Sequence, residues 1–122
     1  MVIVAPQGNL AGLVAFDKST GNIVWKTRPL KGYNFYVSPL LATIDGVEQI
    51  IMVSPYSKED SLKTNEVVGF NAKDGKELWS YNGLHSFATI TPPVMIDQNR
   101  IFLTDCSYNN NYAPISILIE VK

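Results

Sequence analysis

The chain of 122 residues has little of the chemistry that most catalytic and metal sites require. It contains one cysteine, Cys106, and one histidine, His85. One cysteine excludes an internal disulfide and a multi-cysteine zinc site, and one histidine excludes a multi-histidine metal site. Ten basic and eleven acidic side chains leave a net charge of −1, whereas surfaces that bind nucleic acid or anionic membranes need a basic excess.

Long hydrophobic runs are also missing. No stretch approaches the roughly 20 apolar residues of a membrane span. The apolar start, Met1 to Ala5, stops at Pro6 and is shorter than the core of a secretory signal. Apolar residues nevertheless make up 46% of the chain, which is typical of a folded core rather than of disorder. We therefore expect one folded domain over residues 1–122.

Short apolar or alternating runs, bounded by Gly, Pro, Asn or Asp, recur along the chain, and helical periodicity is almost absent. Such runs are typical of β-strands. The sequence predicts an all-β fold with ten strands: Val2–Ala5, Gly12–Phe16, Asn22–Thr27, Pro39–Ile44, Glu48–Val53, Glu66–Phe70, Lys76–Tyr81, Pro93–Ile96, Arg100–Thr104 and Ile115–Val121.

The sequence repeats itself at an offset of 54 residues. The segment 13–25, LVAFDKSTGNIVW, aligns with the segment 67–79, VVGFNAKDGKELW. The offset matches three pairs of residues for which we expect structural roles: Gly21 with Gly75, Trp25 with Trp79, and Pro39 with Pro93. The glycines suit a tight turn with positive φ, the tryptophans fill gaps between sheets, and the prolines begin strands. A period near 50 residues with about four strands per repeat indicates β-propeller blades.

These segments resemble the pyrroloquinoline-quinone-like (PQQ-like) β-propeller repeat of the quinoprotein alcohol dehydrogenase-like superfamily. The resemblance implies a partial blade over residues 1–27, a complete blade over 39–81 and a partial blade over 93–122. About two and a half blades cannot close a ring, since a propeller has at least four. We expect a fragment of a longer propeller, covered by the remaining blades of the parent protein. The alternative is self-association through the open blade faces.

The longer connections between the strands are predicted to emerge on one face of the molecule and to form a binding surface there. Loops of uneven length on a rigid scaffold are where binding usually occurs, and tyrosine supplies contact area at low entropic cost. A protein or a small ligand would bind there. The candidate residues are Tyr33, Tyr36, Tyr56, His85, Tyr108 and Tyr112.

Catalytic constellations are not found in the sequence. Quinone-dependent members of the superfamily use a calcium ion and often an adjacent cysteine pair, but Cys106 is followed by Ser107. We assign no catalytic, cofactor-binding or metal-binding residue, and expect PQQ and calcium only if the full-length protein is a dehydrogenase. The predicted function is a non-catalytic binding or scaffolding module. The alternatives are part of a PQQ-dependent dehydrogenase and a ligand-sensing domain. By resemblance, the protein is periplasmic or otherwise extracytoplasmic.

Overall fold

The structure is a computed structural model that describes residues 1–6, 9–33, 37–54, 56–57, 66–83, 91–104 and 116–122. Within these ranges the chain forms strands and turns and no helix, so none could span a membrane. The strands are β1 (Val2–Val4), β2 (Val14–Phe16), β3 (Ile23–Lys26), β4 (Gly32–Tyr33), β5 (Leu40–Ile44), β6 (Val47–Ser54), β7 (Tyr56–Ser57), β8 (Glu66–Asn71), β9 (Glu77–Tyr81), β10 (Val94–Met95), β11 (Arg100–Thr104) and β12 (Ser116–Glu120).

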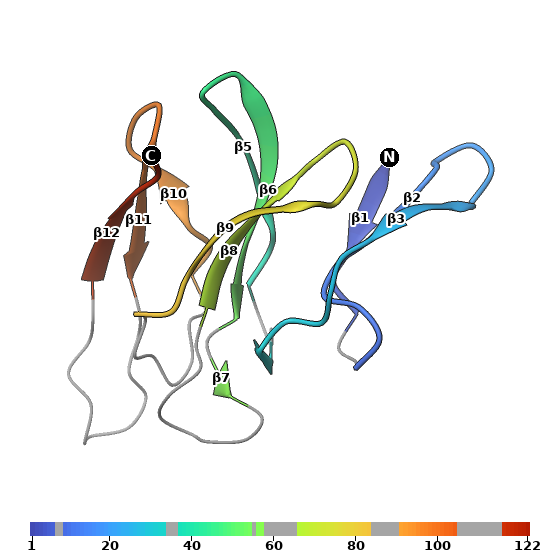
Figure 1. The fold of residues 1–122 in the computed structure, drawn as a ribbon, viewed down its shortest axis with the longest axis horizontal. Helices are drawn as coiled ribbons and strands as arrows, with labels where there is room; N and C mark the ends of the chain where they lie inside the picture. The colour runs from blue at the N-terminus through green and yellow to red at the C-terminus, as the bar shows by residue number, and fades with distance from the viewer. Residues whose placement is uncertain (7–8, 34–36, 55, 58–65, 84–90, 105–115) are drawn as a thin grey trace.

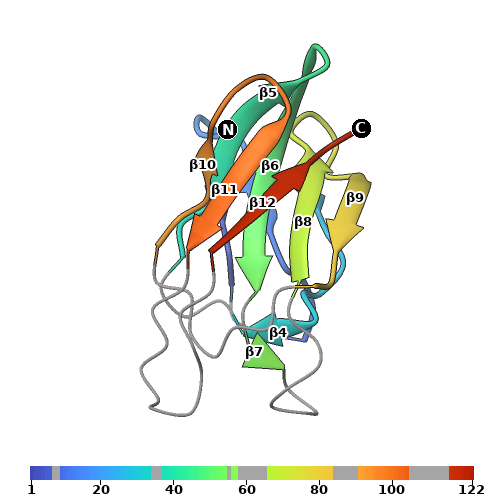
Figure 2. The same ribbon diagram turned by 90° about the vertical axis from the view of Figure 1, so that its left-hand side faces the viewer.

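Three antiparallel sheets stand in a row (Figure 1). The first sheet has the order β1-β2-β3, the central sheet β5-β6-β8-β9 and the last sheet β10-β11-β12. Figure 2 turns the last sheet toward the viewer, with the central sheet behind it. These consecutive meanders confirm the predicted all-β, incomplete propeller fold. A fourth sheet, β4-β7, has two short strands that the sequence did not predict.

The two middle strands of the central sheet, β6 and β8, are buried on both faces. In β6, Ile50 and Met52 pack against the first sheet, while Ile51 and Val53 belong to a second apolar cluster shared with the last sheet. Successive side chains of a strand point to opposite faces, so alternate residues enter different clusters. The unbroken apolar run in β6 therefore follows from a position between two neighbours.

The turns after β2 and β8 have matching hydrogen bonds. The amide of Asp17 donates to Asn22 O and the amide of Asn71 to Lys76 O, both at 2.8 Å. Gly21 and Gly75 have φ of 74° and 72°, a region that glycine enters without steric penalty. The register of both strand pairs shifts at the same place, at Ala15/Phe16 and at Gly69/Phe70.

The two tryptophans occupy equivalent positions in their sheets but make different contacts. Trp25 pairs with Ala15 across β2 and β3, and Trp79 pairs with Gly69 across β8 and β9. The Trp25 indole crosses to the central sheet, where its Nε1 donates to Ala72 O at 3.2 Å. The Trp79 Nε1 donates to the Gln49 side chain at 2.7 Å, within its own sheet. Trp25 thus ties two sheets together.

Two prolines stand directly before inner strands. Pro39 precedes β5, which begins at Leu40, and Pro93 precedes β10, which begins at Val94. Proline lacks an amide hydrogen, and the position before a strand is one where no ladder bond is lost.

Candidate functional site

The candidate site lies at the end of the sheets where the longer connections leave. The last residues of β1, β3, β6, β9 and β11 all lie at this end, which we call the loop end (Figure 1). The short turns that follow β2, β5, β8 and β10 lie at the opposite end, the turn end. Two of the loop-end connections, residues 27–39 and 54–66, are described in part. The described residues of these two connections contact each other and form the candidate site.

A small sheet joins these two connections. β4 pairs antiparallel with β7, with Gly32 opposite Ser57 and Tyr33 opposite Tyr56. The Gly32 amide also donates to Ser54 Oγ at 2.9 Å. One connection leads from the first sheet to the central sheet and the other lies within the central sheet. Backbone pairing therefore holds residues 32–33 of one connection against residues 56–57 of the other.

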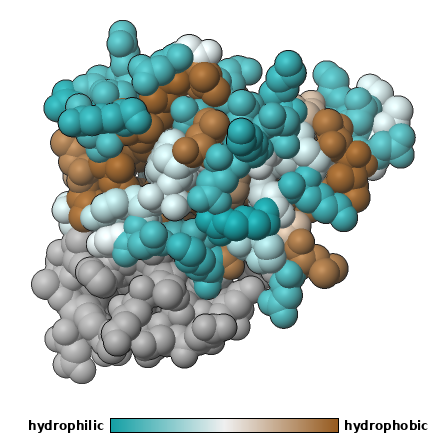
Figure 3. All heavy atoms as spheres, viewed as in Figure 1, coloured by the Kyte–Doolittle hydropathy of each residue, from teal (hydrophilic) through white to brown (hydrophobic). Residues whose placement is uncertain are grey.

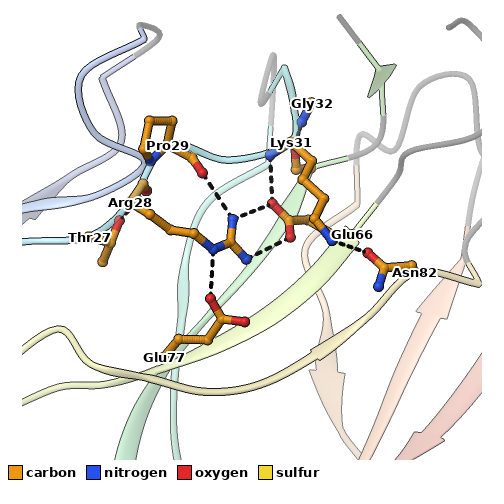
Figure 4. Close-up of polar contacts among 9 residues, drawn as sticks. Thr27, Arg28, Pro29, Lys31, Gly32, Glu66, Glu77 and Asn82 are labelled. Atoms are coloured by element: carbon orange, nitrogen blue, oxygen red, sulfur yellow. Dashed lines mark hydrogen bonds and ion pairs between the residues drawn. The ribbon is translucent and has the colours of Figure 1, made fainter. Parts of the chain in front are cut away.

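A buried carboxylate anchors the same region. Glu66 begins β8 opposite Ser54, and its side chain is 0% exposed. Both of its oxygens accept from Arg28, with Nη1 to Oε1 at 3.1 Å and Nη2 to Oε2 at 2.9 Å (Figure 4). Oε1 also accepts from the Lys31 amide at 2.6 Å. A charge is stable in such a place only when it is paired and hydrogen-bonded, and Glu66 meets both conditions.

Arg28 links this carboxylate to a second one nearer the surface. Its Nε donates to Glu77 Oε2 at 2.6 Å, and its Nη1 donates to the Pro29 carbonyl at 2.9 Å (Figure 4). The hydrogen bonds that Arg28 donates to Glu66 raise the pKa of Arg28, against an opposing effect of burial. The hydrogen bond from Arg28 lowers the pKa of Glu77. The guanidinium is thus held as a permanent cation between two carboxylates.

Residues on both sides of Arg28 also form hydrogen bonds. The hydroxyl of Thr27, which is buried, accepts from the Leu13 amide at 2.9 Å and donates to the Arg28 carbonyl at 2.9 Å. On the other side, Lys31 Nζ donates to Asn82 Oδ1 at 2.9 Å. The segment 27–32 is therefore bonded to the first sheet at one end and to the central sheet along the rest.

Comparison with known proteins agrees with this architecture. A family model described as outer membrane protein assembly factor BamB, built on the PQQ-like repeat, matches residues 1–115. The chain belongs to this family. No curated protein and no solved structure matches it. Membership of the BamB family confirms the resemblance to PQQ-like repeats that the 54-residue offset predicted.

The structure brings together the backbones of two of the predicted binding residues, Tyr33 and Tyr56. The other four lie outside the described residues: Tyr36, His85, Tyr108 and Tyr112. The sequence analysis missed Arg28 and Glu66. At the 54-residue offset, Arg28 aligns with Asn82 and Glu66 aligns with Gly12. The sequence signal for these two residues was therefore that each is charged where the other repeat has an uncharged residue.

The BamB family shares its repeat with quinone-dependent enzymes, so the fit of PQQ and calcium to this chain has to be examined. In the part of the chain that the structure describes, no three His, Cys, Asp or Glu side chains are grouped to hold a metal ion. Among the described residues, the buried carboxylate is Glu66, and its oxygens already accept hydrogen bonds from Arg28 and Lys31. The described residues offer no carboxylate cluster for calcium, and we derive no chemistry through calcium or the quinone.

Proposed function

We propose that the chain is a non-catalytic binding and scaffolding module that presents the loop end of its blades to a protein partner. The proposal rests on one observation above all: residues 28–33 are held to residues 56–57 by β4-β7 and to Glu66 by its ion pair with Arg28. A surface that is already ordered loses less entropy on binding than a surface that must first be ordered. A rigid platform of this kind suits recognition of a protein.

The family suggests the setting of this recognition. The matching model is described as an outer membrane protein assembly factor. We propose that this chain also acts in an extracytoplasmic compartment, the periplasm, on proteins destined for an outer membrane. Such proteins reach the membrane unfolded, and their strands carry alternating apolar and polar residues with aromatic girdles. Tyrosine suits such segments, because its ring makes apolar contacts and its hydroxyl forms hydrogen bonds.

A binding experiment with a defined probe tests the proposal. The probe is an outer-membrane β-barrel protein, unfolded in urea and diluted into buffer that contains the immobilised chain. We expect saturable binding by the wild type. Tyr33→Ala and Tyr56→Ala should each weaken it about fivefold or more, since a tyrosine that anchors an interface contributes at least ~1 kcal/mol.

Val47 provides the control. It is 38% exposed and begins β6 at the turn end, away from β4-β7, so Val47→Ala should leave the affinity within about twofold of the wild type. An equal loss from all three substitutions would show that the β4-β7 region is not the binding site. No saturable binding by the wild-type chain would end the proposal.

A further inference from the structure

The outer face of the first sheet carries a row of apolar side chains. Val2, Phe16 and Ile23 lie opposite one another across β1, β2 and β3. Val2 and Ile23 are each 50% exposed. Beside them is a hollow of about 340 Å³, whose lining includes Val14 and Leu10. Contiguous apolar surface of this kind marks an interaction site.

The outer face of the last sheet carries a corresponding row. Val94, Phe102 and Leu118 lie opposite one another across β10, β11 and β12. Val94 is 52% exposed and Leu118 54% exposed. Apolar surface is visible at both ends of the row of sheets in Figure 3. The molecule thus has two apolar end faces, which we call the first face (Val2, Phe16, Ile23 and the hollow) and the last face (Val94, Phe102, Leu118).

The repeat shows what covers a face like the first one. Val14 and Phe16 correspond, at the offset of 54 residues, to Val68 and Phe70 of the central sheet. Val68 and Phe70 are buried in the cluster that contains Ala15 and Trp25 of the first sheet. The same two residue types, in the same places, are therefore buried inside the chain by a neighbouring sheet.

The repeat also shows what the last face covers. Val94 corresponds to Leu40 at the same offset, and each begins its sheet's inner strand. Leu40 lies opposite Ile51, as Val94 lies opposite Phe102. Leu40 and Ile51 belong to the cluster that packs the central sheet against the last sheet. Each end face therefore repeats one side of a junction already present in the chain.

We propose that, in the 122-residue chain by itself, the first face of one molecule binds the last face of a second copy, head to tail, in the place that a further blade of a longer propeller would take. This arrangement continues the order of the internal junctions, in which each sheet presents its last-facing side to the first-facing side of its successor. The contact joins two different patches, so it is heterologous and each copy can bind two others. It leaves the loop end untouched and is independent of the proposed binding of a protein partner there.

The turn at Gly21 has space beside it that the equivalent turn at Gly75 lacks. A Cβ added at Gly75 would lie 2.6 Å from the Trp25 ring, whereas one added at Gly21 has no atom of the described residues within 4 Å. The turn of the central sheet is thus covered by a neighbouring blade, and the equivalent turn of the first sheet is open.

Sedimentation velocity of the full 122-residue chain tests this proposal. The wild type should show masses that rise with concentration in multiples of the 13.5 kDa monomer. Ile23→Lys blocks the first face and Leu118→Lys blocks the last face, so each variant alone should remain a monomer. A mixture of the two should form a one-to-one dimer that grows no further, because each variant retains the face that the other lacks. Leu41→Lys, at a strand residue 60% exposed and outside both faces, should associate as the wild type does.

Three results would overturn the proposal: a wild-type chain that stays monomeric at every concentration, single variants that still associate, or a mixture of variants that remains monomeric. Circular dichroism establishes that each variant is folded. If either variant fails to fold, Val2→Lys replaces Ile23→Lys and Val94→Lys replaces Leu118→Lys, since each lies in the same row with similar exposure.

Discussion

Glu66 and Glu77 bind the same guanidinium group, so one substitution made at both positions compares a buried carboxylate that accepts several hydrogen bonds with a more exposed one. The Glu66 side chain is 0% exposed and the Glu77 side chain is 34% exposed. Glu66 accepts three hydrogen bonds from Arg28 and Lys31, and Glu77 accepts one from Arg28. Glutamine has nearly the same shape as glutamate, which keeps the packing constant.

The expected loss follows from these contacts. In Glu66→Gln, one side-chain oxygen remains as an acceptor, and the new amide group turns donor hydrogens toward the donors of Arg28 or Lys31. A lost hydrogen bond to a charged group contributes about 1.5–3 kcal/mol, and a buried polar group left unsatisfied costs about 1–3 kcal/mol. Because Arg28 is 35% exposed and regains some hydration, we expect a loss of about 3 kcal/mol in the free energy of unfolding. Glu77→Gln should lose less than about 1 kcal/mol, as exposed ion pairs do.

Urea unfolding at pH 7, followed by the fluorescence of Trp25 and Trp79, measures both losses. All variants are compared at one low protein concentration, and the dependence on urea should stay constant if the folded state is unchanged. The double variant Arg28→Met/Glu66→Met should recover most of the stability, because an apolar pair replaces a buried ion pair at little cost. Losses for Glu66→Gln and Glu77→Gln that agree within about 0.5 kcal/mol would refute the assigned role of burial.

Three further outcomes are expected. Gly75→Ala should destabilise the fold by about 2–4 kcal/mol and Gly21→Ala by about 1 kcal/mol. Both glycines have positive φ, but only at Gly75 would the added Cβ collide with the Trp25 ring. Equal losses in urea unfolding would contradict this packing. Hydrogen bonds from the Thr20 and Ser19 amides lower the pKa of Asp17, so the stability it contributes is present above its unfolded pKa of about 4 and is lost as the pH falls through the folded value. The difference between the urea midpoints of the wild type and Asp17→Asn should therefore shrink as the pH is lowered. A difference that does not change with pH would contradict this role of Asp17. Titration with pyrroloquinoline quinone and calcium should give no saturable absorbance change, and stoichiometric binding at micromolar concentration would show the cofactor prediction to be wrong.

Strand positions could be read from the sequence because each strand is an apolar run with turn residues at both ends. Arg100–Thr104 agrees to the residue, and Glu66–Phe70 extends by one residue to Asn71. The 54-residue offset placed Gly21 and Gly75 in equivalent turns, where a positive φ leaves few alternatives to glycine. These features are local, and local signals survive in a single sequence.

The contacts at the loop end, which are the β4-β7 pairing and the Arg28–Glu66 ion pair, could not be predicted from the sequence in the same way. β4 and β7 are two residues long and have no alternation to detect. Arg28 and Glu66 lie 38 residues apart, and neither has a charged counterpart in the other repeat. Their contact depends on the folding of the first sheet against the central one. Pairing between segments distant in sequence is a tertiary property, so only the three-dimensional structure showed it.

Amide hydrogen exchange, with and without the unfolded outer-membrane β-barrel protein, is the most direct test of the proposal that the loop end binds proteins. We expect the probe to slow exchange in residues 27–33, 54–57 and 66, while the turns 17–21 and 71–75 at the opposite end exchange as before. Slowed exchange confined to those turns, or no change at the loop end under saturating probe, would contradict it.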